Sequence, residues 1–156
     1  MNPAPARYAS GLFGVCSLLC CALAVPAFDG ADADEATLLV ALIGQAFSEH
    51  TTRNIDFGVS ATITVGSTAT LLAILLWFRF GFARLILVGL GTLTALYYLY
   101  ASARLAEAGA PAAFYLWPLI ALALWTAATL VAALPVTGRA MRGHSASQPY
   151  HPVPPY

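Results

Sequence analysis

Four long apolar stretches alternate with polar segments along the chain. They are residues 8–28, 58–78, 83–103 and 112–134, and none has a charged residue or a histidine in its interior. Each has about 20 residues, enough for a helix to cross a hydrocarbon core of roughly 30 Å. The apolar positions are continuous rather than alternating, which favours helices over strands. The sequence therefore predicts an all-α, integral membrane four-helix bundle.

The segment between the first two predicted spans, residues 29–57, is the longest connection. It begins with acids, and Asp32 with Glu35 three residues later is typical of a helix start. Ala36–Phe47 is almost wholly apolar, but it is too short to span a bilayer. We therefore expect an amphipathic helical segment in this external loop, lying along the interface or folded back over the bundle.

The chain changes character after the fourth predicted span. Residues 137–156 contain Pro149, Pro152, Pro154 and Pro155 between serines and tyrosines. Such a segment cannot bury a core, so a membrane domain of residues 1–136 should be followed by a mobile cytoplasmic tail. The two PxxP spacings could dock in an aromatic groove, although a solubilising end is the preferred interpretation.

The composition excludes several classes of protein. Sixty per cent of the residues are hydrophobic, 9% are charged and the formal net charge is zero. A soluble domain carries roughly a quarter charged residues, so a soluble enzyme is excluded. A neutral chain also has no electrostatic attraction for nucleic acid. The partner indicated first is the lipid bilayer.

The positions of the arginines predict the orientation. If the chain crosses the membrane four times, five arginines lie on one side and two on the other. Cytoplasmic loops carry the excess of basic residues, so both termini should be cytoplasmic in a multi-pass protein of the cell membrane. The five are Arg7, Arg79, Arg84, Arg139 and Arg142.

Residues 1–27 could also be a signal peptide. Arg7, an apolar core and Val25-Pro26-Ala27 fit that pattern. The apolar run is long for a signal core, so retention as the first span is preferred.

Small residues recur in the two central spans. Gly58, Thr62, Gly66 and Thr70 stand four residues apart in the second span, and Gly89 and Gly91 lie in the third. Small residues at this spacing let helices approach closely, and hydroxyls can bond across the contact. A helix-packing seam is preferred to a polar path for a solute. Because the link between these spans is the shortest, we expect them to form a hairpin packed on these faces.

No group of residues predicts catalysis, a cofactor or a metal. Cys16 and Cys20 share a helix face and Cys21 is adjacent, but no other span offers a histidine or carboxylate at that depth. Packing is therefore the preferred role of these cysteines. In the outer loop, His50 with Glu49 and Asp56 forms at most a weak metal site. We expect a protein that is not an enzyme.

Trp77, Arg79, Ala83 and Arg84 form a Trp-x-Arg-x-x-x-Ala-Arg turn between two spans. This stretch, within residues 72–101, resembles a pattern of small uncharacterised four-span integral membrane proteins of high-GC actinobacteria. The basic segment 135–142 is similar to theirs, whereas the acidic first loop is longer. The resemblance implies the four-span architecture and no particular chemistry.

The absence of ionisable residues from the spans disfavours proton-coupled transport by this chain alone. The function that the pattern favours is a non-catalytic accessory, assembly or scaffold subunit of a larger membrane protein complex. Its partners would be other membrane protein subunits or further copies of the chain. The alternative is a small channel or carrier for a neutral or polar solute, acting as a homo-oligomer lined by the second span.

Overall fold

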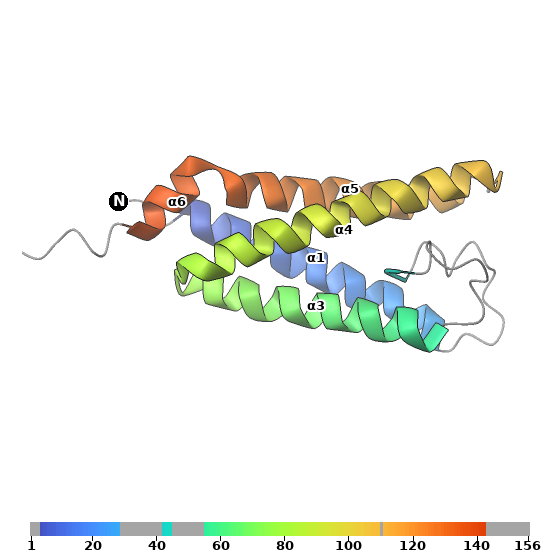
Figure 1. The fold of residues 1–156 in the computed structure, drawn as a ribbon, viewed down its shortest axis with the longest axis horizontal. Coiled ribbons are helices and arrows are strands. Elements are labelled where there is room, and N and C mark those ends of the chain that lie inside the picture. Colours follow the sequence, from blue (N-terminus) through green and yellow to red (C-terminus); the bar gives the residue numbers. More distant parts are fainter. Residues whose placement is uncertain (1–3, 29–41, 45–54, 110, 143–156) are drawn as a thin grey trace, which may run out of the picture.

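The regular elements of the structure are all helices (Figure 1). This computed structural model describes residues 4–28, 42–44, 55–109 and 111–142. The elements are α1 (Ala4–Phe28), α3 (Ile55–Trp77), α4 (Gly81–Glu107), α5 (Ala112–Ala133) and α6 (Pro135–Arg142). Of the predicted amphipathic segment 36–47, only residues 42–44 are described, and they form a turn; the rest lies outside the described residues.

Three helices among the described residues are long and apolar enough to cross a membrane. They cover Asp56–Trp77, Gly81–Glu107 and Phe114–Ala133, with mean hydropathies of 1.8, 1.6 and 1.9. They coincide with the second, third and fourth predicted spans. The first predicted span forms α1, a helix of 25 residues, and its membrane crossing stays a prediction.

The long helices associate as two pairs. α1 packs chiefly on α3, α4 packs chiefly on α5, and α1 also contacts α5, so that it joins the two pairs (Figure 1). α3 and α4 are consecutive in the chain but share a smaller contact. The prediction of a hairpin packed along its small-residue faces is therefore wrong. The short link brings the ends of α3 and α4 together, but along their lengths α3 packs on α1 and α4 packs on α5.

In the turn between α3 and α4, a residue with left-handed backbone conformation ends α3. Arg79 has a φ of 68°. The amide of Phe80 donates to the Leu75 carbonyl at 3.1 Å, and the amide of Arg79 donates to the Leu76 carbonyl at 2.9 Å. These two bonds make a Schellman motif, in which glycine is the usual left-handed residue. The nearest glycine, Gly81, is not used at this position and begins α4.

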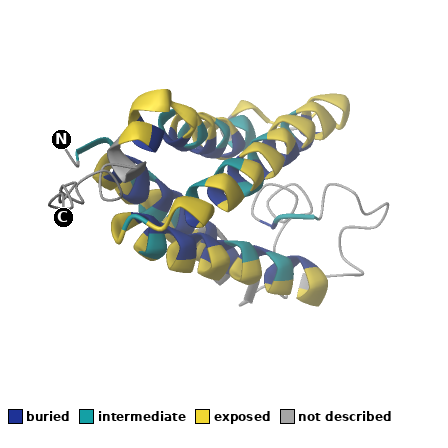
Figure 2. Ribbon diagram, turned by 60° about the vertical axis from the view of Figure 1, so that its left-hand side comes forward, coloured by how far each residue is buried: buried dark blue, intermediate teal, exposed yellow. Residues whose placement is uncertain are grey.

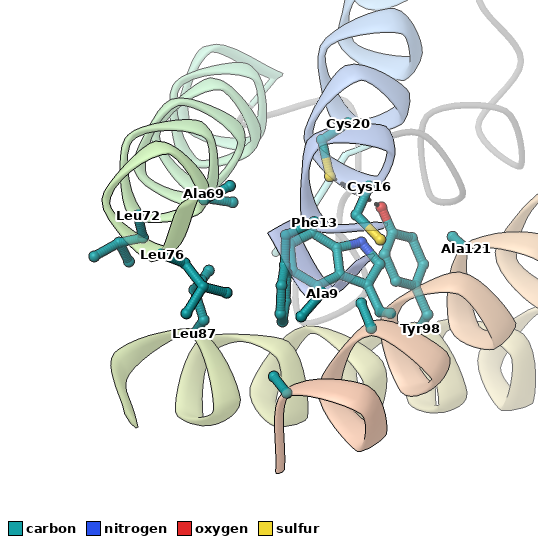
Figure 3. Close-up of a cluster of buried hydrophobic side chains, with 14 of the residues drawn as sticks. Ala9, Phe13, Cys16, Cys20, Ala69, Leu72, Leu76, Leu87, Tyr98 and Ala121 are labelled. Atoms are coloured by element: carbon teal, nitrogen blue, oxygen red, sulfur yellow. Dashed lines mark hydrogen bonds between the residues drawn. The ribbon is translucent and has the colours of Figure 1, made fainter. Parts of the chain in front are cut away.

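α1 supplies much of the core between the two pairs. Figure 3 shows Phe13, Cys16 and Cys20 of α1 between Tyr98 of α4 and Leu76 of α3. Phe13 meets Trp125 of α5 edge to face, with ring centroids 5.9 Å apart. Figure 2 shows the buried faces of the helices turned towards this core, while their other faces are exposed.

The side chain of Arg84 forms hydrogen bonds with the C-terminal end of α5. Its Nε donates to the Ala132 carbonyl at 2.6 Å, and its Nη2 donates to the carbonyls of Ala133 and Leu134 at 2.9 and 3.2 Å. The last carbonyls of a helix have no partner within the helix, so this guanidinium caps α5. Pro135 then begins α6, which runs to Arg142 and so occupies the start of the predicted tail 137–156. Residues 143–156 lie outside the described part.

The capping contact predicts that Arg84→Gln lowers the free energy of unfolding by about 1.5–3 kcal/mol, because hydrogen bonds from a charged donor are lost. The measurement is chemical denaturation in mild detergent, followed by far-ultraviolet circular dichroism. Arg139→Gln is the control, since it removes one positive charge from an exposed site in α6. Its expected effect is within about 0.5 kcal/mol. Equal losses in the two variants would contradict the capping role.

Candidate functional site

The four-residue repeat of α3 meets α1 at Gly66 and Thr70. Gly58, Thr62 and Gly66 are buried. A Cβ atom added at Gly66 would lie 3.2 Å from the Cys21 sulfur and 3.5 Å from the Ser17 carbonyl oxygen, both on α1. The glycine thus allows the two backbones to approach closely, as small residues do at membrane helix contacts.

Serines of α1 reinforce this contact. Ser17 Oγ donates to the Gly66 carbonyl at 2.5 Å and lies 2.5 Å from Thr70 Oγ1. Two helical turns away from this pair, Ser10 Oγ donates to the Ala73 carbonyl at 2.7 Å. Thr70 therefore takes part in the seam through its hydroxyl. The sequence identified the face of α3 that carries small residues, but it did not identify α1 as the helix that packs on it. The hydrogen bonds from Ser10 and Ser17 of α1 were not predicted.

Thr62 also has a role outside helix packing. Its Oγ1 accepts a hydrogen bond from the Ile43 amide at 2.8 Å and donates to the Gly58 carbonyl at 2.8 Å. The Tyr97 hydroxyl donates to the Leu42 carbonyl at 2.5 Å. These bonds fasten the turn at residues 42–44 to both α3 and α4. No local sequence signal could have identified this contact, because its partners are far apart in the chain.

The two glycines predicted as packing positions in α4 differ. A Cβ added at Gly91 would collide with Thr129 Oγ1 of α5 and lie 3.3 Å from Phe13 of α1. Gly89 is exposed, and nothing lies within 4 Å of such an atom there. Gly91 is therefore the contact residue of α4, and its partners are α5 and α1 rather than α3.

A second row of small polar residues runs along the opposite face of α3. Ser60, Thr64 and Ser67 are spaced as neighbours on one helix face, and all three are exposed. The hydroxyls of Thr64 and Ser67 donate to the carbonyls of Ser60 and Ile63, each at 2.7 Å. We call these three residues the outer face of α3. No described helix of the chain covers it.

The splayed arrangement of α3 and α4 leaves an apolar groove of about 430 Å³ between them. Val65 of α3 and Leu90 and Leu93 of α4 line it, and Ile43 closes one end. The hydroxyl of Thr94 in its wall donates to the Leu90 carbonyl at 2.9 Å. The groove therefore offers shape and apolar surface rather than polar recognition.

The predicted topology arginines lie at one end of the bundle. This end holds the start of α1, the α3–α4 turn and α6 (Figure 1). The guanidinium of Arg7 lies 5.2 Å from the centre of a Trp77 ring, which is a cation–π contact. Arg79 lies in the turn, Arg84 caps α5, and Arg139 and Arg142 belong to α6. The opposite end carries the Arg104–Glu107 ion pair at 3.3 Å.

The candidate chemical groups do not assemble into a reactive site within the described residues. Cys16 and Cys20 are buried free thiols and Cys21 is an exposed one. No three metal-ligating side chains come together in the described ranges. Asp56 is exposed at the start of α3, whereas Glu49 and His50 lie outside the described residues. The contacts that are described concern packing.

No family model, no curated protein and no solved structure matches the chain. Its function is therefore inferred from its own residues and contacts.

The α4–α5 contact predicts that Gly91→Ala destabilises the bundle by about 1–3 kcal/mol, because the new methyl displaces Thr129. Thr129 would also lose the hydrogen bond that its hydroxyl donates to the Trp125 carbonyl at 2.7 Å. Gly89→Ala is the matched control, and it should be neutral or stabilising by up to about 1 kcal/mol. Unfolding free energies in mild detergent measure both effects. A loss in Gly89→Ala as large as that in Gly91→Ala would refute the assignment.

Proposed function

We propose that the chain is a four-span protein of the cell membrane with both termini on the cytoplasmic side. Three helices long and apolar enough to cross a membrane support this proposal, and α1 lies along α3 as a fourth helix of similar length. The concentration of arginines at one end supports the orientation, because basic segments stay on the cytoplasmic side.

This topology predicts the labelling of single added cysteines. In intact cells, Ser145→Cys should resist a membrane-impermeant thiol reagent, whereas Thr51→Cys should react. The unmodified chain is the control, because it contains Cys16, Cys20 and Cys21. Both added cysteines should react after the cells are opened. Equal labelling of the two variants in intact cells would contradict the proposed orientation.

Within this membrane, we infer that the chain acts as a non-catalytic accessory or assembly subunit of a larger membrane protein complex. The observation that carries this inference is the outer face of α3. Small hydroxyl residues in membrane helices gather where helices meet, because they permit close approach and can bond across the contact. Here Ser60, Thr64 and Ser67 form such a face, and no described helix of the chain covers it.

A second candidate is a homo-oligomeric channel or carrier for a neutral or polar solute. Thr64 favours it, because its side chain is exposed on the outer face rather than buried against α1. Several copies joined around this face would surround a path with hydroxyl groups. The core of one copy is instead filled by large side chains, including Phe13, Tyr98 and Trp125.

The accessory role predicts that a partner subunit copurifies with the chain in stoichiometric amount from native membranes in mild detergent. The double variant Thr64→Leu and Ser67→Leu should reduce its recovery about tenfold or more, because two branched side chains block the approach of a partner helix. Quantitative mass spectrometry of the purified complex measures the recovery.

The matched control is Thr92→Leu, since Thr92 is also exposed and donates its hydroxyl to its own helix, to the Val88 carbonyl at 2.8 Å. This variant should keep the partner. A chain that purifies alone contradicts the accessory role. Solute flux into liposomes that contain only this chain, abolished by Thr64→Leu, would establish the channel in its place.

A further inference from the structure

The acidic residues of the chain are confined to two parts of the sequence, whereas arginines also occur elsewhere. All seven acids lie at positions 29–56 or at position 107, so residues 1–28, 57–106 and 108–156 contain none. Among the residues that the structure describes, the end of the bundle that holds the start of α1, the α3–α4 turn and α6 carries arginines and no acidic side chain. We call it the basic end.

The arginines of the basic end are not neutralised within the described part of the chain. The ion pair described there, Arg104–Glu107, belongs to the opposite end. Arg7 and Arg139 are exposed and Arg79 is half-buried. Arg84 differs from these, because its guanidinium is engaged with the carbonyls of α5. Because Arg7 lies over the ring of Trp77, Arg79 and Arg139 are the described arginines of this surface that remain for an anionic ligand.

Apolar groups surround these cations at the same level of the bundle. Exposed aromatic side chains mark the α3–α4 turn, and Leu134 and Val136 are 51% and 52% exposed at the start of α6. The aromatic residues are Trp77, Phe78, Phe80 and Phe82. Rings and arginines together are typical of the headgroup level, where apolar bodies enter the acyl region and cations meet phosphates.

We propose that the basic end is a binding surface for anionic phospholipids, which it selects over zwitterionic ones through their headgroup charge. The described residues of this surface offer positive charge and no acidic side chain, so an anionic headgroup supplies the opposite charge. Guanidinium groups fit phosphate oxygens through paired hydrogen bonds. The inference rests on the proposed placement in a bilayer, but it requires neither the accessory role nor a particular side.

The experiment is native mass spectrometry of the full chain in mild detergent, titrated with phosphatidylglycerol or with phosphatidylcholine of the same acyl chains. The wild type should bind phosphatidylglycerol about 25-fold more tightly than phosphatidylcholine, or better. The double variant Arg79→Gln and Arg139→Gln should weaken that binding by about 25-fold, at about fivefold for each arginine near a headgroup. Binding of phosphatidylcholine should stay unchanged.

Arg104→Gln is the matched control, because it removes one arginine from the opposite end of the bundle. This variant should still prefer phosphatidylglycerol to phosphatidylcholine. For the wild type itself, the preference should fall as salt screens the charges, which tests the proposal without any substitution. Equal affinity for the two lipids, an equal loss in Arg104→Gln, or displacement of the lipid by millimolar inorganic phosphate would overturn the proposal. A chain that selects phosphatidylglycerol while both added cysteines label in intact cells would support this inference and overturn only the proposed orientation.

Discussion

The need to satisfy backbone and side-chain polar groups without water governs this bundle. Hydrocarbon offers no hydrogen-bond partners, so every hydroxyl on a membrane helix must find one in the protein. Most of the described serines and threonines do this by donating to carbonyls, as Ser10 and Ser17 do across the α1–α3 seam. At the end of α5 the same need is met by Arg84, whose guanidinium reaches three carbonyls. The indole Nε1 of Trp125 is the exception among the described buried side chains, because it has no partner.

The positions of the glycines decide which helices can come close enough to use these bonds. Gly66 brings α1 against α3, and Gly91 brings α5 and Phe13 of α1 against α4. Through these two contacts α1 packs on α3 and also meets the pair of α4 and α5. α3 and α4 are then held together by their short turn at one end and by the turn at residues 42–44, fastened by Thr62 and Tyr97, farther along. The apolar groove between them follows from this arrangement.

Continuous hydrophobicity predicted the helices well, and for the same reason it could not predict their neighbours. The predicted span 112–134 appears as Ala112–Ala133, and 58–78 appears as Ile55–Trp77. In a helix that is apolar on every side, no polar face indicates the direction of the core. α3 has small residues on two faces, so the sequence could not decide which of them meets α1. The cap by Arg84 was equally hidden, because its partners lie 48–50 residues further along the chain.

The outer face of α3 limits the kind of partner that could bind it. Its Thr64 and Ser67 hydroxyls already donate to carbonyls of their own helix, so exposure to lipid leaves neither donor unsatisfied. A partner helix would therefore gain little from new hydrogen bonds to these hydroxyls, and close packing of the two backbones would drive the association. Close packing needs small side chains on both helices, because a large residue on either side holds the axes apart. A partner of this face should accordingly present small residues at intervals of about four, so that it can approach as closely as α1 approaches α3 at Gly66.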